Sequence, residues 1–282
     1  MARLQTSSVT FSLIVVITLI LPVVASGEDT AGLETVDLYN VGLEYMHTER
    51  WAEAADVLKQ AIAKDSKDAD AHFKLGYSYY QLGRFTEAVK HFKQAAELKP
   101  GDDEATHWLG LAHFALKQYP QAVKAYRQTV LVNPLDAEAY THLGVAYTYL
   151  EDYRKSAESF RQVVRLKPKE ALAHFNLGLA ELESDHSQLA LKSFQEAIRL
   201  DPKMSGAHVN LGAVYNKLGR YADAIKAAQE GLKVNPKSAA GHYQLGMAYL
   251  KSGQTQRAKE EQLLLEPINP DLAKELLQLI SK

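Results

Sequence analysis

A period of 34 residues runs through most of the chain. Prolines, glycines and a third series of small residues all recur at this spacing. The prolines are Pro100, Pro134, Pro168, Pro202, Pro236 and Pro270. The glycines are Gly42, Gly76, Gly110, Gly144, Gly178, Gly212 and Gly246. The third series is Ala54, Ala88, Ala122, Ser156, Ala190, Ala224 and Ala258. One structural unit is therefore repeated, and an internal repeat of this length indicates a solenoid.

Each unit predicts two helices joined by a turn. In residues 69–102, apolar residues recur at helical spacing in both halves. They are Ala71, Leu75, Tyr79 and Leu82, then Ala88, Phe92, Ala95 and Leu98. The Gly83-Arg84 pair marks the turn, and Pro100 ends the unit because proline cannot continue the preceding helix. The small residues Gly76 and Ala88 predict a close helix crossing whose neighbouring space Phe92 fills.

This unit resembles the tetratricopeptide repeat. Its pattern is a large residue, Leu-Gly, a Tyr, a later Ala, an aromatic residue, another Ala and a terminal Pro. Seven frames of 34 residues follow one another, with position 1 at Thr35, from 35–68 to 239–272. The resemblance implies an all-α fold, a right-handed superhelical solenoid of helix–turn–helix repeats. The expected domains are a linker at 28–34, seven repeats at 35–270 and a capping helix at 271–282.

The last frame departs from the pattern in a way that predicts a cap. Pro267 falls inside its second helix, so that helix should end near Leu265. The residues after it carry an apolar face, formed by Leu272, Leu276, Leu279 and Ile280. A helix with this face fits the cap that an open-ended stack of repeats requires.

The first 27 residues differ from the repeats and predict a signal peptide. Arg3 is their only charged residue, an uncharged apolar run extends from Val9 to Ala25, and small residues follow it. Cleavage after Ala25 or Gly27 would place the mature protein outside the cytoplasm, in the periplasm. The alternative is an uncleaved anchor, which would tether the repeats to a membrane. The apolar run is slightly shorter than the roughly 20 residues that span a bilayer, which favours cleavage.

The composition excludes several kinds of chemistry. The 282 residues include no Cys, so disulfides, thiolate metal sites and cysteine nucleophiles are absent. The net charge of −2 argues against nucleic acid as a partner. No phosphate-binding glycine loop, HExxH or GxSxG motif occurs. The sequence therefore predicts no enzyme activity and no cofactor.

Histidines are the one group that suggests metal binding. Four of the ten share frame position 4, namely His72, His174, His208 and His242. Packed helices lie about 8–10 Å apart, whereas zinc needs nitrogens at about 2.0–2.1 Å. These rings are therefore expected to fill space between helices. His107 and His142 occupy other frame positions, and no metal site is expected there either.

The family resemblance implies a concave groove lined by the first helix of each repeat. In related proteins, frame positions 2, 5, 6, 9, 12 and 13 tend to face that groove. The candidate peptide-binding residues carried over in this way are largely aromatic or amide side chains. They are Tyr39, Asn40, Phe73, Tyr77, Tyr80, His107, Phe114, His142, Phe175, Asn176, Asn210, Tyr243 and Gln244. Such a lining fits an extended or helical peptide.

Two family patterns are incomplete or missing. Asn occupies the sixth position in three of the seven frames, a partial similarity to the repeat domain of O-linked N-acetylglucosaminyltransferases. No glycosyltransferase domain follows, so transferase activity is not implied. The Lys and Asn residues that clamp a terminal carboxylate in chaperone-tail receptors are absent from positions 5 and 9.

Acidic residues cluster at the start of several repeats. They are Asp68, Asp102, Asp136 and Glu170 at the unit ends, with Asp70, Glu104 and Glu138 at the second position. Most such residues form solvated faces, but they would also favour a partner with basic residues.

The sequence thus predicts a non-enzymatic scaffold or adaptor of the cell envelope that binds a partner polypeptide. The alternatives are an accessory subunit that presents substrate to a separate catalytic chain, and a membrane-anchored scaffold. The oligomeric state is left open.

Overall fold

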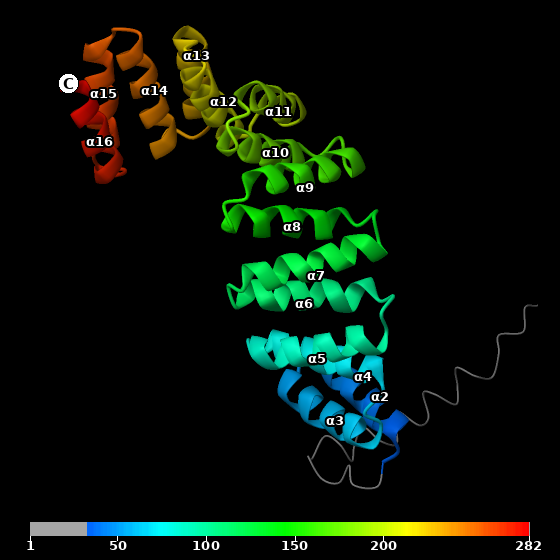
Figure 1. Ribbon diagram of the computed structural model, residues 1–282. Helices are drawn as coiled ribbons and strands as arrows, with labels where there is room; N and C mark the ends of the chain where they lie inside the picture. Colours follow the sequence, from blue (N-terminus) through cyan, green and yellow to red (C-terminus); the bar gives the residue numbers. More distant parts are fainter. Residues whose placement is uncertain (1–32, 282) are drawn as a thin grey trace, which may run out of the picture. The chain divides into compact units, whose positions relative to one another are not determined.

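The computed structural model describes residues 33–281, which form helices joined by short turns (Figure 1). The expected signal peptide lies outside the described residues, as does most of the expected linker. The described residues contain fifteen helices and no strand, so the fold is an all-α solenoid of helical repeats. No helix in residues 33–281 combines the length and the apolar character needed to cross a membrane.

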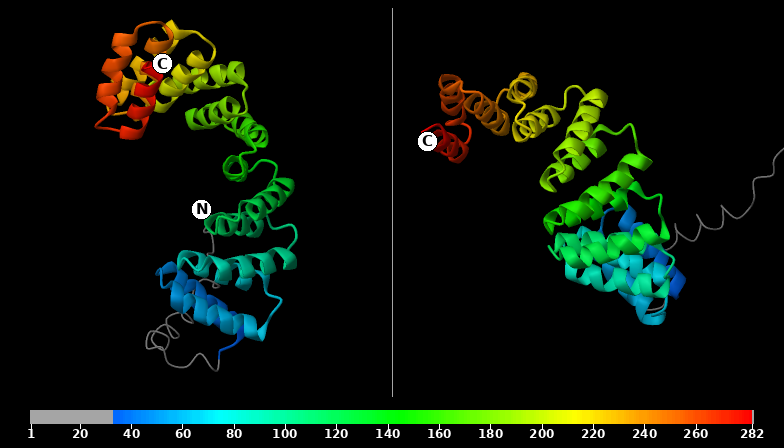
Figure 2. Two further views of the ribbon diagram at one scale, coloured as in Figure 1. Left: turned by 60° about the vertical axis from the view of Figure 1, so that its left-hand side comes forward. Right: turned by 45° about the horizontal axis from the view of Figure 1, so that its top comes forward.

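The helices form two compact units that divide between Gln118 and Tyr119. In the first unit, consecutive helices pack side by side (Figure 2). Its helices are α2 (Thr35–His47), α3 (Trp51–Lys64), α4 (Ala69–Gln81), α5 (Phe85–Leu98) and α6 (Asp103–Ala115).

The second unit repeats the same arrangement, and each of its helices packs on the next. Its helices are α7 (Tyr119–Val132), α8 (Ala137–Tyr149), α9 (Tyr153–Leu166), α10 (Ala171–Glu183), α11 (Ser187–Leu200), α12 (Ser205–Lys217), α13 (Tyr221–Val234), α14 (Ala239–Lys251), α15 (Thr255–Leu265) and α16 (Pro270–Ile280). The even-numbered helices from α2 to α14 begin at position 1 of each frame and are called first helices below. The odd-numbered helices are called second helices.

Several first helices begin at an aspartate that caps them. Asp68 Oδ1 accepts a hydrogen bond from the Ala71 backbone N–H at 2.9 Å, and Asp136 Oδ1 accepts one from Ala139 at the same distance. Asp102 caps α6 in the same way, whereas the Glu170 side chain makes no capping bond. Each cap satisfies an otherwise unbonded N–H of the first turn. Three of the four acidic residues at unit ends therefore have a structural role.

The predicted close crossing of the two helices of a repeat is confirmed. A Cβ atom on Gly76 would lie 2.9 Å from the Phe92 ring of the same repeat. Phe92 is fully buried, and so is Ala88. Only glycine leaves enough room for the ring at this crossing.

The turn between the two helices contains a residue with a left-handed backbone. Gly83 has a φ of 72° and donates its N–H to the Tyr80 carbonyl oxygen at 2.9 Å. The same place, frame position 15, is held by four non-glycine residues with φ between 56° and 67°. They are Glu49, Lys117, Glu151 and Asp185. A side chain is strained in this conformation, so these turns differ in stability.

The four histidines at frame position 4 bind the turn that precedes their helix. In each case Nε2 lies within hydrogen-bond distance of the carbonyl oxygen six residues earlier. The pairs are His72 with Ser66 (3.2 Å), His174 with Pro168 (2.9 Å), His208 with Pro202 (3.0 Å) and His242 with Pro236 (2.9 Å). His72 and His242 are buried, as expected, whereas His174 and His208 are partly exposed.

The C-terminal helix α16 lies against the last pair of helices. α15 ends at Leu265, two residues before Pro267, and Asn269 then caps α16 through the Leu272 N–H. α16 contacts both α14 and α15 and fully buries Leu276. A Cβ atom on Gly246 of α14 would lie only 2.5 Å from Leu276, so the two helices approach closely.

Candidate peptide-binding surfaces

Five aromatic side chains form a cluster in the first unit, called the aromatic cluster below. It consists of Trp51, Tyr77, Tyr80, Phe85 and Trp108, which are all partly exposed. Trp108 lies at the centre, with ring centroids 4.7 Å from Tyr77 and 5.2 Å from Tyr80, both in edge-to-face contact. Trp51 contacts Tyr77 at 5.8 Å, and Phe85 contacts Tyr80 at 5.2 Å. Edge-to-face contacts of this kind hold rings in fixed orientations.

Tyr77 and Tyr80 were predicted from the frame, but three members of the cluster were not among the candidate residues. Trp108 occupies frame position 6, but the candidates at that position were amide and histidine side chains. Trp51 and Phe85 are the first residues of α3 and α5. Their shared place, frame position 17, is aromatic in five of the seven frames, and that recurrence is a signal the sequence does contain.

Phe73 belongs to the core rather than to an open surface. Only 7% of it is exposed, and its ring centroid lies 5.5 Å from that of the buried Phe92. The structure therefore corrects the prediction that Phe73 lines a groove. The side chain was assigned by its frame position, but the neighbouring second helix covers it.

The other predicted residues of the first unit lie on α2 and α6. Asn40 is exposed, and Tyr39 is partly buried. Burial raises the pKa of the Tyr39 phenol, and the nearby carboxylates of Asp70 and Asp68 raise this pKa further. His107 and Phe114 are partly buried on α6.

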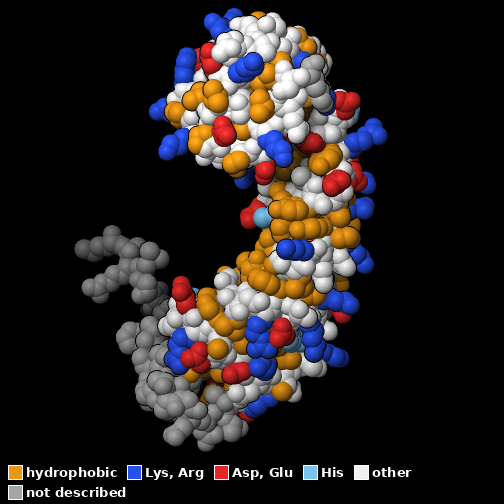
Figure 3. Space-filling view, turned by 90° about the vertical axis from the view of Figure 1, so that its left-hand side faces the viewer, with side chains coloured by type: hydrophobic (Ala, Val, Ile, Leu, Met, Phe, Trp, Pro, Cys, Tyr) orange, Lys and Arg blue, Asp and Glu red, His pale blue; other side chains and the backbone are white. Residues whose placement is uncertain are grey.

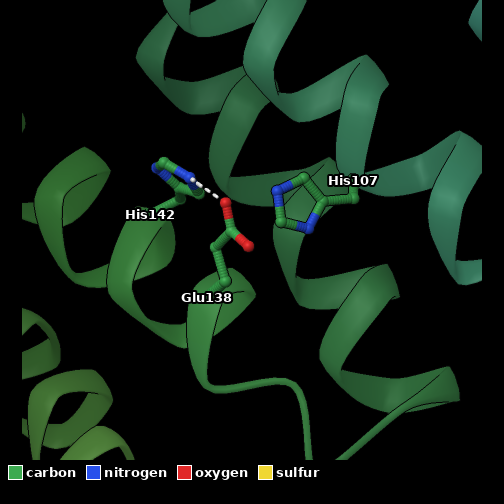
Figure 4. A group of neighbouring side chains, drawn as sticks. All are labelled: His107, Glu138 and His142. Carbon is green, nitrogen blue, oxygen red and sulfur yellow. Dashed lines mark ion pairs between the residues drawn. The ribbon is translucent and has the colours of Figure 1, made fainter.

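In the second unit, His142 pairs with a carboxylate one helical turn away. Its Nε2 atom lies 3.6 Å from Glu138 Oε1 on α8, the contact dashed in Figure 4. Glu138 is the more exposed of the two residues. An exposed pair of this kind adds little to stability. His107, which Figure 4 also labels, belongs to α6 of the first unit.

The amide side chains of the second unit do not act as one ladder. Asn210 Nδ2 donates to the Gly206 carbonyl oxygen of its own helix at 2.8 Å. Asn176 is partly exposed on α10. The Gln244 side chain accepts a hydrogen bond from Asn216 Nδ2 at 3.1 Å. The Asn210 and Gln244 amides therefore bind their own or an adjacent helix, which weakens the similarity to an asparagine ladder.

Phe175 and Tyr243 are also partly covered. The Phe175 ring centroid lies 5.8 Å from that of the buried Phe194. The Tyr243 hydroxyl donates to Glu275 Oε1 of α16 at 2.5 Å. Burial and this hydrogen bond to a carboxylate raise the pKa of Tyr243 to about 12. The C-terminal helix thus engages the residue that was predicted as the last aromatic contact for a peptide.

Hydrophobic side chains also reach the surface between charged ones, as Figure 3 shows. In the second unit, Leu131, Leu135, Leu172 and Leu263 are each more than half exposed. Leu172 lies at position 2 of its frame, on the side predicted to face a ligand. Leu131 and Leu135 lie on and just after α7, a second helix.

Sequence comparison identifies the repeat. Models described as tetratricopeptide repeat match residues 39–103 and 145–205, 81–143, 206–238 and 227–260. The chain belongs to the tetratricopeptide repeat family. Members of this family generally serve as protein-interaction modules without catalytic activity. No curated protein matches the sequence.

Solved structures of tetratricopeptide repeat proteins share the fold. MamA from Desulfovibrio magneticus RS-1, from its residue 41 onward, is 26% identical with a TM-score of 0.55, covering 61% of this chain and 98% of that one. YrrB, described as a protein with an unusual peptide-binding site, is 20% identical with a TM-score of 0.56, covering 67% and 99%. A protein from Parabacteroides merdae is 18% identical with a TM-score of 0.58, covering 89% and 100%.

Proposed function

We propose that this protein is a non-enzymatic scaffold of seven tetratricopeptide repeats that binds a partner polypeptide through its first helices. The observation that carries the proposal is the aromatic cluster of the first unit. Its rings are partly exposed yet fixed by mutual contacts, so little conformational entropy remains to be lost on binding. Tyr and Trp side chains also contribute a large share of the binding energy at protein interfaces.

The composition of this surface favours a peptide over a small molecule. The cluster extends over residues from α3, α4, α5 and α6 rather than lining one closed cavity. The exposed Asn40 on α2 adds an amide that can donate to and accept from a peptide backbone. A peptide-binding site in YrrB, which shares the fold, supports the same use of the repeats here.

The proposal includes export from the cytoplasm. Residues 1–27 have the charge distribution, apolar run and small-residue exit of a signal peptide. After cleavage the repeats would act in the periplasm, and without cleavage they would be tethered to a membrane. The intact mass of the protein purified from the cell envelope distinguishes these two cases.

Crosslinking pull-downs from the native cell envelope test the binding role. The variant pair Tyr77→Ala with Tyr80→Ala removes two rings of the cluster and leaves the buried Phe73 in place. We expect it to lose the crosslinked partner while its helical content, measured by circular dichroism, is retained. The matched variant Tyr77→Phe with Tyr80→Phe keeps both rings and should keep the partner. Full recovery of the partner with both alanine substitutions would contradict the proposal.

A further inference from the structure

A cleft of about 420 Å³ opens between α7 and α9, on the side of the second helices. Leu143 and Tyr147 of α8 form its apolar floor, and both are buried. Leu131 of α7 stands at its edge and is 73% exposed. The cleft is widely open to solvent rather than enclosed. This space, called the α7–α9 cleft below, is separate from the aromatic cluster, which belongs to the first unit.

At the corresponding junctions elsewhere in the second unit, hydrogen bonds or ion pairs connect each second helix to the first helix that follows it. Between α9 and α11, Arg161 and Ser193 both contact the Glu181 carboxylate of α10. Between α11 and α13, Gln195 donates to the Tyr215 hydroxyl at 3.4 Å.

The next junction, between α13 and α15, is closed in a similar way. There Gln229 donates to the Tyr249 hydroxyl at 3.2 Å, and His242 pairs with Glu261 at 2.7 Å.

The α7–α9 cleft lacks such a side-chain hydrogen bond or ion pair. The residue that corresponds to Gln195 and Gln229 is Arg127, and the tyrosine of α8 is Tyr147. Within residues 33–281, Arg127 makes no hydrogen bond or ion pair, and it is exposed at the rim. Lys155 of α9 lies on the opposite rim, with Nζ 5.5 Å from the Tyr147 ring centroid. Its partner at 2.6 Å is Asp152, at the start of α9.

The two helices beside the cleft carry an excess of positive charge. α7 carries Lys124 and Arg127 and no acidic residue, and α9 carries four basic residues and Glu158 alone. These two helices thus carry six basic residues and one acidic residue, although the whole chain has a net charge of −2. Of the charged residues, Arg127, Lys155 and Glu158 line the cleft itself. The second helices α13 and α15 each carry equal numbers of the two signs. α11 carries two basic residues and one acidic residue, so the excess of positive charge is largest on α7 and α9. This excess favours an acidic partner.

We propose that the α7–α9 cleft is a second binding site, which takes a bulky apolar side chain of a partner polypeptide whose flanking residues are acidic. The apolar side chain would contact Leu131, Leu143 and Tyr147. The flanking carboxylates would pair with Arg127 and Lys155 at the two rims. The residues of this site all belong to the second unit, and none of them belongs to the aromatic cluster.

A labelled nine-residue peptide, with phenylalanine at its centre and Asp or Glu at every other place, tests this site in a fluorescence anisotropy titration of the full-length protein. We expect saturable binding that weakens with added salt. A peptide with alanine at the centre should bind about tenfold more weakly, because the apolar contact is lost. A peptide with Lys in place of the acidic residues should not bind. Equal affinity for the phenylalanine and alanine peptides would overturn the proposal, since charge alone would then explain binding.

Matched variants locate the binding on the protein. Arg127→Glu and Leu131→Glu change exposed residues of the cleft and should each weaken binding about tenfold. Lys124→Glu changes a basic residue one turn earlier on α7 that does not line the cleft, and Leu135→Glu changes a leucine that is 75% exposed just beyond α7. Both controls should retain the affinity within about twofold. Equal losses in the cleft variants and their controls would overturn the proposal.

A photoreactive peptide provides an independent readout and separates this site from the proposed function. Its crosslinks should fall on α7, α8 and α9, and crosslinks confined to other helices would overturn the proposal. The Tyr77→Ala and Tyr80→Ala substitutions should leave the affinity for this peptide unchanged. A loss of affinity in that variant would assign the peptide to the first helices instead.

Discussion

His72 and His91 face each other through their Nδ1 atoms, which lie 3.1 Å apart. The His72 Nε2 atom donates to the Ser66 carbonyl oxygen, so Nδ1 of the neutral His72 ring is an acceptor. His91 therefore donates from Nδ1. Burial, followed by the positive charge of a protonated His72 and of Lys90 and Lys59, lowers the pKa of His91 to about 4. This hydrogen bond requires that one of the two Nδ1 atoms carries no proton.

The first prediction is that acid destabilises the protein through His91. The unfolded chain binds a proton at this residue near pH 6.5, whereas the folded chain does so only near pH 4. The unfolded state thus holds more protons between these values, and the free energy of unfolding falls as the pH is lowered from 6.5 towards 4. Urea unfolding at pH 7 and pH 5 should show a smaller difference in His91→Gln than in the wild type.

An exposed histidine provides the control for this measurement. His47 lies at the end of α2 and is exposed, so His47→Gln replaces a histidine without disturbing the His72–His91 contact. It should not reproduce the effect of His91→Gln. The same pH dependence in His91→Gln and in the wild type would contradict the assignment to His91.

The second prediction concerns two glycines at equivalent places in different repeats. A Cβ atom on Gly144 would lie 2.9 Å from the Phe160 ring, whereas one on Gly212 would lie 3.4 Å from its nearest neighbours, Ala224 and Ala228. Gly144→Ala should therefore lower the melting temperature. Gly212→Ala should keep or raise it, because alanine favours a helix over glycine by about 1 kcal/mol. Thermal unfolding followed by circular dichroism compares them directly.

A bulkier side chain extends the same test. Gly144→Leu should destabilise the repeat by a further amount of about 1–3 kcal/mol, since the extra atoms have no space beside Phe160. Combining Gly144→Ala with Phe160→Leu should recover part of the loss. An unchanged melting temperature in Gly144→Leu would mean that the helices do not cross closely at this point.

Frame position 15 supplies the third prediction. Glu151 has a φ of 57° and is exposed, and Gly83 holds the same place in another repeat with a φ of 72°. Glu151→Gly should stabilise the protein by up to about 1 kcal/mol, because glycine adopts a positive φ without the steric strain of a side chain. Gly83→Ala should destabilise it by a similar amount, although a Cβ atom there would have no neighbour within 4 Å. Urea unfolding measures both changes, and effects of the same sign would contradict the explanation.

Much of the architecture could be predicted because a repeat multiplies each local signal. The helix ends, the glycine crossings and the stop before Pro267 all follow from residue types at fixed spacing. The surface could be predicted only in part. Phe73 and Tyr77 are four residues apart on one helix, yet Phe73 is buried and Tyr77 is not. The difference depends on how closely the next helix approaches, which the sequence of a single helix does not contain.

The same limit explains the features that were not predicted. Asp68 and Asp136 each directly precede a helix, a position that predicts a capping role. Because several acidic residues recur at these positions, they were interpreted as a charged surface instead. At the α7–α9 cleft, Arg127 replaces the Gln found at two later junctions. The sequence contains this difference, but it does not show that Arg127 makes no contact with Tyr147.

The fourth prediction separates folding from binding at Phe73 and Tyr77. Phe73→Ala should lower the free energy of unfolding by about 3 kcal/mol, since it leaves a cavity beside Phe92. Tyr77→Ala should lower the free energy of unfolding by less, because part of the Tyr77 ring is already exposed to water. Urea unfolding of the two single variants makes the comparison. A larger loss in Tyr77→Ala would place Tyr77 in the core and disqualify it as a binding residue.

The fifth prediction concerns the buried carboxylate of Glu181, which is only 4% exposed. Its Oε2 atom accepts from Ser193 Oγ at 2.7 Å, and its Oε1 atom lies 3.3 Å from an Arg161 nitrogen. Arg161→Gln should destabilise the protein by about 1–3 kcal/mol, because a buried charge loses its cationic partner.

A second substitution should reverse this loss. The two following junctions place Gln beside Tyr at the positions of Arg161 and Glu181, as in the Gln229–Tyr249 pair. The double variant Arg161→Gln with Glu181→Tyr rebuilds that neutral pair and should be more stable than Arg161→Gln alone. A double-mutant cycle in urea measures the coupling, which should be favourable because the two residues act as one unit. Purely additive losses would show that Arg161 and Glu181 stabilise the protein independently, and the carboxylate would then depend on Ser193 alone.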